Sequence, residues 1–226
     1  MTMGSVDRIA PGEGVAPLAD VLTYRNDLVV RRFRKRFDIS QGDADAIFVE
    51  LLRWLWYLAS TSPTPDNPEA HAIDEPLFII DEMWHEFIIV TRDYTKFCND
   101  MCRRYIHHVP NSGDDARTKH EGLCEVKASL VALLGRKRVK YTAIYDVLGK
   151  DAFVLWYLEF PQRFSAEVIS LMRKKTGRVD AGPPYVIDKR PQDAEQEKSD
   201  LIEEALFKNL FLSLPDKADS FGVKED

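Results

Sequence analysis

Apolar residues recur at helical spacing along most of the chain. From Leu18 to about Phe37 they fall three or four positions apart, and a basic stretch, RRFRKRF, occupies the exposed side. The stretch DISQGDADAIFVELLRWLWYLAS predicts the next helix, because Ser40 is a suitable N-cap and acidic residues follow in the first turn. Apolar positions cover most of the circumference of this helix, so we expect it to lie at the centre of the fold.

A proline-rich loop separates this helix from one that begins near Pro76, a favourable first residue. The pattern carries that helix to about Tyr105, either unbroken or with a break near 91–93. Two further helices are predicted over 118–134 and 138–148, with glycines at 135 and 149 as their terminators.

The stretch DAFVLWYLEFPQRFSAEVISLMRKK is expected to be helical, with a kink before Pro161 as an alternative. Within it, FVLWYLEF could alone form a buried strand, but its neighbours have a helical period. The pattern therefore predicts an all-α fold, with a compact, bundle-like helical domain over 18–176. Residues 1–17, rich in glycine and proline, are expected to form a flexible leader.

Residues 177–226 are predicted to form a polar linker followed by an amphipathic helix at about 200–214. This helix either packs back on the core or binds a partner protein or a second copy of the chain, which would make a homodimer. A membrane surface is a poorer candidate, because it favours a basic polar face and this helix is acidic.

Composition narrows the function classes. The formal charge of -6 gives no reason to expect general nucleic-acid binding. The basic stretches RRFRKRF and GRKRVK are expected to be solvated faces, with binding of nucleic acid or an acidic partner as the weaker alternative. No apolar run approaches the roughly 20 residues that span a bilayer, so no membrane span is expected. Three cysteines do not make a disulfide framework, and we expect a cytoplasmic protein.

Candidate chemistry centres on the helix that follows Pro76. Asp81 and His85 are four residues apart, which places them on one face of a helix, one turn from each other. If the chain turns back after this helix, His107 or His108 could approach the same face. Two histidines and one carboxylate suit non-haem iron, with zinc also possible. The alternative is a buried polar network in which the carboxylate only orients an imidazole.

Glu82 and His85 also have the Glu-x-x-His spacing of two-metal helical bundles. Those bundles need a second copy of the motif, which this sequence lacks, so a two-metal site is not expected. Glu82 and Tyr94 are the candidates to stand beside the metal ligands or to act as acid or base.

Three stretches resemble a known family: DEMWHEFIIVTRDYTKFC, YIHHVP and YTAIYDVLGKDAFVLWY. They are similar to bacterial proteins of unassigned function described as glycine-rich domain-containing protein-like, and the Asp-x-x-Trp-His core resembles that of plant glycine-rich domain proteins. The resemblance covers about 75–157 and implies an α-helical domain without an established reaction. Its matching positions are Asp81, Trp84, His85, Thr91, Tyr94, Cys98, His107, His108 and Pro110. The chain departs from the family in having no glycine-rich segment and in adding residues 177–226.

Two functions follow from these patterns. The first is a helical metalloprotein, an iron- or zinc-dependent enzyme of unknown substrate. The second is a non-catalytic interaction module, in which the Asp/Trp/His cluster is structural and the helix at 200–214 binds a partner.

Overall fold

The computed structural model describes residues 14–63, 70–108, 123–173 and 194–210. These residues are helical apart from short connections and one isolated bridge between Phe37 and Arg173. The prediction of an all-α fold is therefore confirmed for the described part of the chain.

The chain divides into two compact units. Unit 1 draws on Met1–His71, Ile79–Val109 and Ile169–Gly182, and unit 2 draws on Ala72–Phe78, Pro110–Val168 and Pro183–Asp226. The predicted domain at 18–176 contributes residues to both units. Residues 1–13 of the predicted leader and 177–193 of the predicted linker lie outside the described residues.

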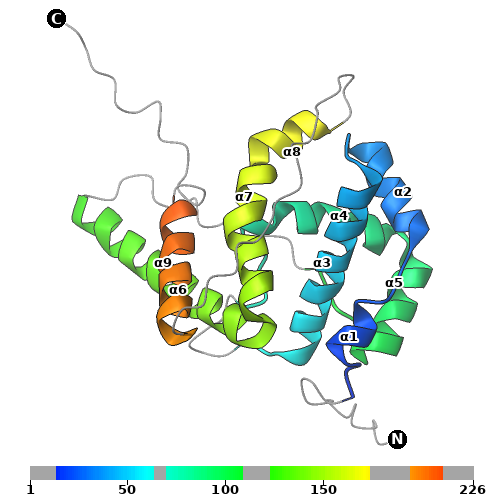
Figure 1. Cartoon of the computed structure of the whole chain (residues 1–226), viewed down its shortest axis with the longest axis horizontal. Helices are drawn as coiled ribbons and strands as arrows, with labels where there is room; N and C mark the ends of the chain where they lie inside the picture. The colour runs from blue at the N-terminus through cyan, green and yellow to red at the C-terminus, as the bar shows by residue number, and fades with distance from the viewer. Residues whose placement is uncertain (1–13, 64–69, 109–122, 174–193, 211–226) are drawn as a thin grey trace, which may run out of the picture. The chain divides into compact units, whose positions relative to one another are not determined.

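Unit 1 begins with two helices, α1 (Leu18–Val21) and α2 (Asp27–Arg36), where the apolar spacing suggested one stretch (Figure 1). The chain is divided at Asn26, which has extended backbone angles and caps α2. Its side-chain oxygen accepts hydrogen bonds from the backbone amides of Leu28 and Val29 at 3.1 Å each. Its side-chain nitrogen donates to the carboxylate of Asp93 at 2.8 Å. One asparagine thus starts a helix and ties that start to a distant part of the unit.

The long helix α3 (Gln41–Ser60) supplies much of the unit 1 core. As predicted, Ser40 is its N-cap, and the Ser40 hydroxyl accepts from the amide of Asp43 at 3.0 Å. The prediction of a heavily buried helix is also confirmed, with fully or nearly fully buried side chains at Ala44, Ile47, Phe48, Leu51, Leu52, Trp54, Leu55, Tyr57 and Ala59.

The helix predicted after Pro76 is broken, as one alternative held. A short 3-10 turn, Glu75–Leu77, leads into α4 (Phe78–Ile89), and α5 (Thr91–Phe97) follows after a single residue. That residue, Val90, has non-helical angles of φ -83° and ψ 61°. A π-helical turn, Cys98–Cys102, extends α5.

Unit 2 is built on α6 (Leu123–Val154), which corrects the prediction of two helices separated at Gly135. A glycine inside a helix costs only about 1 kcal/mol relative to alanine. The helix continues past Gly135 to buried side chains at Lys137, Lys140 and Tyr141. Gly149 does interrupt the helix, because its φ of 82° lies in the left-handed region.

The stretch after Gly149 is helical, so the strand alternative for FVLWYLEF is not realised. It contains a π-helical turn, Leu155–Glu159, then α7 (Phe160–Arg163) and α8 (Ala166–Met172). The π turn ends just before Pro161, where the sequence suggested a kink.

The amphipathic helix α9 (Ala194–Lys208) packs back on α6 within unit 2 (Figure 1). Its apolar face is buried at Ile202, Ala205 and Leu206. Ion pairs between Arg138 and Glu203 and between Lys150 and Glu197 show that the two helices run antiparallel. Across the described ranges, none of the helices has both the length and the apolar character that a membrane crossing requires.

Candidate metal centre

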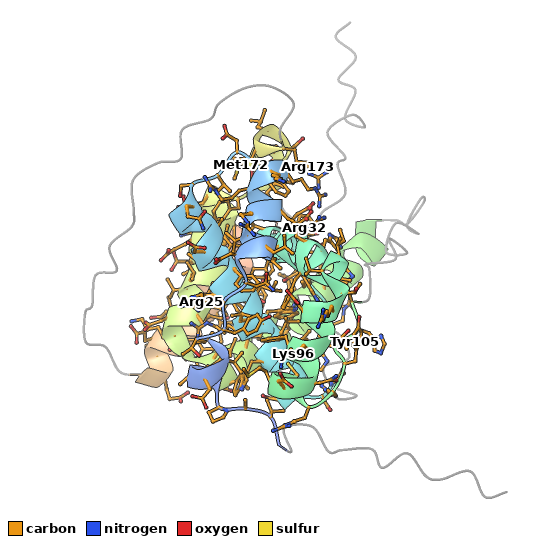
Figure 2. The ribbon with its side chains drawn as sticks, turned by 90° about the vertical axis from the view of Figure 1, so that its right-hand side faces the viewer. Arg25, Arg32, Lys96, Tyr105, Met172 and Arg173 are labelled. Atoms are coloured by element: carbon orange, nitrogen blue, oxygen red, sulfur yellow. The ribbon has the colours of Figure 1, made fainter. Side chains whose placement is uncertain are left out.

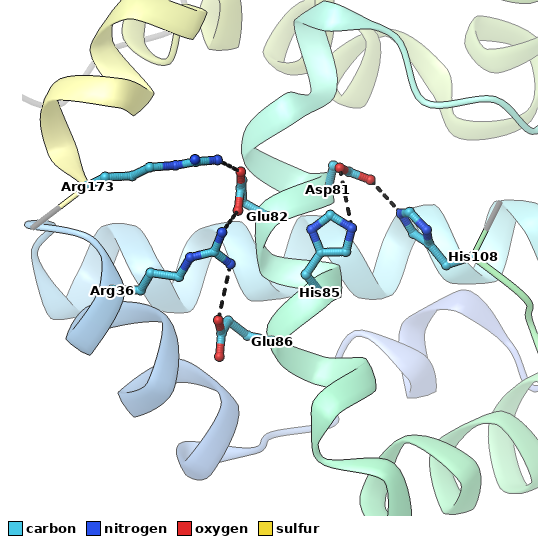
Figure 3. Close-up of polar contacts among 7 residues, drawn as sticks. All are labelled: Arg36, Asp81, Glu82, His85, Glu86, His108 and Arg173. Carbon is cyan, nitrogen blue, oxygen red and sulfur yellow. Dashed lines mark hydrogen bonds and ion pairs between the residues drawn. The ribbon is translucent and has the colours of Figure 1, made fainter. Parts of the chain in front are cut away.

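One face of α4 carries the predicted pair of Asp81 and His85. Helical spacing places the two side chains one turn apart, and His85 Nε2 lies 3.8 Å from Asp81 Oδ2. The site is near the surface, because the His85 side chain is 41% exposed and that of Asp81 is 24% exposed. Both side chains point to the same side of the helix in Figure 3.

The chain turns back after the π-helical turn and runs beside α4. The reversal starts at Arg103, whose φ of 56° is in the left-handed region and is costly for a residue with a side chain. A contact with a distant part of the chain accompanies this conformation: Arg103 Nε donates to the carbonyl of Gly14 at 3.1 Å. The Arg104 guanidinium donates to the carbonyls of Leu58 and Thr61. These bonds anchor the returning segment to the rest of unit 1.

The returning segment delivers His108 to the pair on α4. His108 Nε2 lies 2.7 Å from Asp81 Oδ1, and the rings of His108 and His85 have centroids 4.7 Å apart. One ligand atom from each of these three residues lies within 4.8 Å of the other two. Asp81, His85 and His108 therefore form a two-histidine, one-carboxylate cluster (Figure 3).

The donor set fits a transition-metal ion in its chemistry and nearly in its dimensions. Ligands at about 2.1 Å from a tetrahedral ion are separated by about 3.4 Å, so side-chain movements of about 1 Å would bring this cluster to that geometry. Among the described residues, no lysine or arginine pairs with Asp81, so the carboxylate faces only imidazoles. Three protein ligands leave one position open on a tetrahedral ion and three on an octahedral ion.

The structure separates the two adjacent histidines. His107 is exposed and its ring contacts Tyr105 in a tilted arrangement, with centroids 4.9 Å apart and an interplanar angle of 58°. Successive side chains of an extended segment point to opposite sides, so only one of a histidine pair can face α4. Of the two predicted ligands, the structure brings His108 to the cluster and leaves His107 outside it.

Glu82, predicted as a candidate acid or base, lies on a different side of α4 from the cluster (Figure 3). It pairs with Arg36 at 2.9 Å and with Arg173. Glu86, one turn on, pairs with Arg32 at 3.1 Å and with Arg36 at 3.3 Å. The side chains of Arg32 and Arg173, both labelled in Figure 2, are 38% and 50% exposed.

Tyr94, the other predicted acid or base, is fully buried behind the cluster. Its hydroxyl accepts a hydrogen bond from Trp84 Nε1 at 3.0 Å and donates to the carbonyl of Ile106 at 2.6 Å. Burial raises the pKa of the Tyr94 hydroxyl far above its ordinary value. The hydroxyl therefore faces the returning backbone and stays protonated.

Sequence reasoning missed the residues that place His108. Arg103 and Arg104 were visible only as a basic pair after a helix, and Ile106 contributes through its backbone carbonyl, which leaves no trace in the sequence. Arg32 and Arg36 of the stretch RRFRKRF were expected on a solvated face, but they pair with Glu82 and Glu86.

Comparison with known proteins gives one match. Residues 22–126 match the model of a family described as UCP032817-like, an uncharacterised family. The matched range contains the three clustered residues and Tyr94, and it covers a little under half of the chain. No curated protein and no solved structure matches the chain. The function proposed for this protein therefore rests on the geometry of Asp81, His85 and His108.

Proposed function

We propose that this helical protein binds iron(II) or zinc(II) through Asp81, His85 and His108 and that it is a metal-dependent enzyme. One observation carries the proposal: two imidazoles and one carboxylate from segments 23 residues apart have ligand atoms within 4.8 Å of one another. When bound, an ion of this kind supplies Lewis-acid chemistry, and iron adds redox chemistry.

The open side of the cluster favours an enzyme over a purely structural metal site. Structural zinc sites are closed by four protein ligands, whereas catalytic sites keep a position for substrate. The partial exposure of His85 leaves the cluster accessible from solvent. Glu82 and Tyr94 do not face this open side, so the proposal assigns them no proton-transfer step; it gives Asp81, His85 and His108 the task of holding the ion.

The alternative is a non-catalytic interaction module with a structural polar network. The 2.7 Å contact between His108 and Asp81 favours it, because that pair satisfies both groups without an ion. In this alternative, exposed residues of α9 contact a partner or a second copy. Phe207, at 73% exposure, is the residue to test, because Phe207→Ser leaves the buried face of α9 intact. Loss of self-association or partner binding in this variant, with metal absent from the wild type, favours the alternative.

The adjacent histidines provide a matched experiment for the metal proposal. Tag-free protein is treated with a chelator and then titrated with Zn²⁺ in competition with a chromophoric chelator. His108→Ala is expected to weaken Zn²⁺ binding by about 100-fold or more, because one of three ligands is lost. His107→Ala changes the same kind of residue one position earlier and is expected to alter the affinity by less than about threefold. Equal effects of the two substitutions would contradict the proposed ligand set.

Two further proposals accompany this one. We propose kinship with the glycine-rich domain-containing protein-like family, supported by the convergence of its motif residues Asp81, Trp84, His85 and His108 around one site. We also propose a reducing compartment such as the cytoplasm, supported by Cys98 and Cys102, which are both free and buried.

A further inference from the structure

We infer that Tyr94, with Trp84 and Cys98, is a positioning residue of the metal site, holding Ile106 so that His108 meets Asp81. The inference rests on the proposed function, since it concerns how one ligand of that site is placed. It assigns a role to motif residues that do not touch the ion.

A chain of hydrogen bonds runs through the interior of unit 1. Trp84 Nε1 donates to the Tyr94 hydroxyl at 3.0 Å, and that hydroxyl donates to the Ile106 carbonyl at 2.6 Å. Trp84, Tyr94 and Ile106 are all at most 5% exposed, so water does not compete for these groups. The chain fixes the backbone two residues before His108.

Trp84 also contacts the imidazole of His108 directly. The Trp84 ring meets the His108 ring edge to face, with centroids 4.6 Å apart and an interplanar angle of 73°. The same indole therefore contacts both the His108 ring and the Tyr94 hydroxyl. Asp81 and Trp84 lie one turn apart on α4, so the Asp-x-x-Trp spacing aligns the support with the ligand.

Cys98 is a second buried side chain next to the returning segment. Burial raises the pKa of the Cys98 thiol, and interactions with the Ile106 backbone and the Tyr94 hydroxyl oppose that rise. Cys98 lies four residues after Tyr94, which puts both side chains on one face of the helical segment. Cys98 thus lies close to both partners of the hydrogen bond between Tyr94 and Ile106.

Five side chains and His108 itself account for most of the shared motif positions. Asp81 and His85 provide ligand atoms, whereas Trp84, Tyr94 and Cys98 orient the third ligand. Residues that orient a histidine ligand change metal affinity by about 10- to 100-fold when they are replaced. A change of this size in metal affinity, in a variant that keeps its helical content, distinguishes a positioning role from a general loss of stability.

Tyr94→Phe tests the inference, because it removes only the hydroxyl and keeps the buried ring. We expect Zn²⁺ affinity to fall by about 10- to 100-fold, with helical content unchanged by circular dichroism. We also expect pulsed EPR of the Cu²⁺-loaded variant to show one coordinated imidazole in place of two. Tyr57→Phe, which also removes the hydroxyl of a buried tyrosine of unit 1, is expected to keep two imidazoles and wild-type affinity. Wild-type affinity and two imidazoles in Tyr94→Phe would overturn the inference.

A readout without metal separates this inference from the proposed function. In the metal-free protein, Tyr94→Phe is expected to move the NMR signals of the His108 ring towards those of an unrestrained histidine, while those of His71 stay in place. If the wild type binds no metal but this shift occurs, the positioning role stands and the proposed function fails. If Tyr94→Phe does not fold, Trp84→Phe removes the other end of the hydrogen-bond chain. It is expected to shift the same signals, and unchanged signals would overturn the inference.

Discussion

The two sides of α4 hold carboxylates in opposite surroundings. On one side, Glu82 and Glu86 are almost fully buried, and within the described residues every ion pair they make is with an arginine. On the other side, Asp81 is partly exposed, and its contacts within the described residues are with the imidazoles of His85 and His108. Both arrangements lie within a single helix of 12 residues.

The difference in partners decides what each side can do. A guanidinium is permanently charged, so it neutralises a carboxylate and leaves no room for another cation. An imidazole in its neutral form offers a lone pair, so a carboxylate between two imidazoles keeps its capacity to bind a metal ion. The side with Glu82 and Glu86 is therefore expected to contribute stability, and the side with Asp81 to contribute binding.

The largest expected effect is on metal affinity, in a comparison of two adjacent acids. Asp81→Asn is expected to weaken Zn²⁺ binding by about 1,000-fold, because a charged ligand is lost. Glu82→Gln changes the next residue in the same way and is expected to alter the affinity by less than about threefold. Isothermal titration of both variants checks the prediction, and a large loss in Glu82→Gln would break the division between the two sides.

The second expected effect is on stability. Here the side with Glu86 is expected to matter more than the side with Asp81, which reverses the order expected for metal affinity. Glu86→Ala leaves Arg32 and Arg36 without one carboxylate, and these arginines are 38% and 40% exposed. Because water can solvate them, we expect a loss of about 1–3 kcal/mol in unfolding free energy, below the cost of breaking a fully buried pair. Asp81→Asn is expected to cost less than about 1 kcal/mol in metal-free protein. Urea unfolding in the presence of a chelator measures both, and a larger loss in Asp81→Asn would contradict the assignment.

The smallest expected effect concerns His71, a histidine of unit 1 outside the cluster. Burial, helped by the charge of Arg104, lowers the pKa of His71 to about 4. The unfolded chain therefore binds more protons than the folded one between pH 4 and 6.5. The stability that neutral His71 contributes is complete above pH 6.5 and is lost as the pH falls towards 4.

We expect this loss to be about 1–2 kcal/mol, after allowance for solvent at a partly exposed ring. Urea midpoints of the wild type and His71→Gln are compared at pH 7 and pH 4.5 in the presence of a chelator. The difference between the two proteins is expected to shrink at the lower pH. A stability difference between the two proteins that is independent of pH would contradict the prediction for His71.

The sequence predicted those features that depend on local spacing. The Ser40 cap, the break next to Thr91 and the facing of Asp81 and His85 follow from residues at most four positions apart. Gly135 misled the prediction because a glycine inside a helix costs only about 1 kcal/mol relative to alanine, and α6 continues through it.

Features that depend on distant contacts could not be predicted. The choice of His108 over His107 depends on the direction of the backbone after Arg103, which is held by Gly14 and by the carbonyl of Leu58. Glu82 was a candidate acid because its partners, Arg36 and Arg173, are far away in the sequence. Helical spacing identified the face of a carboxylate, but only the fold identified its counter-ion.

The central claim is that the cluster of Asp81, His85 and His108 binds a transition-metal ion. Elemental analysis by mass spectrometry, on tag-free protein reconstituted with Fe²⁺ without oxygen or with Zn²⁺ and then desalted, tests it most directly. The account predicts about one ion per chain, lost in Asp81→Asn and retained in Glu82→Gln. Less than about 0.2 ion per chain in the reconstituted wild type, with the helical fold intact, would contradict it.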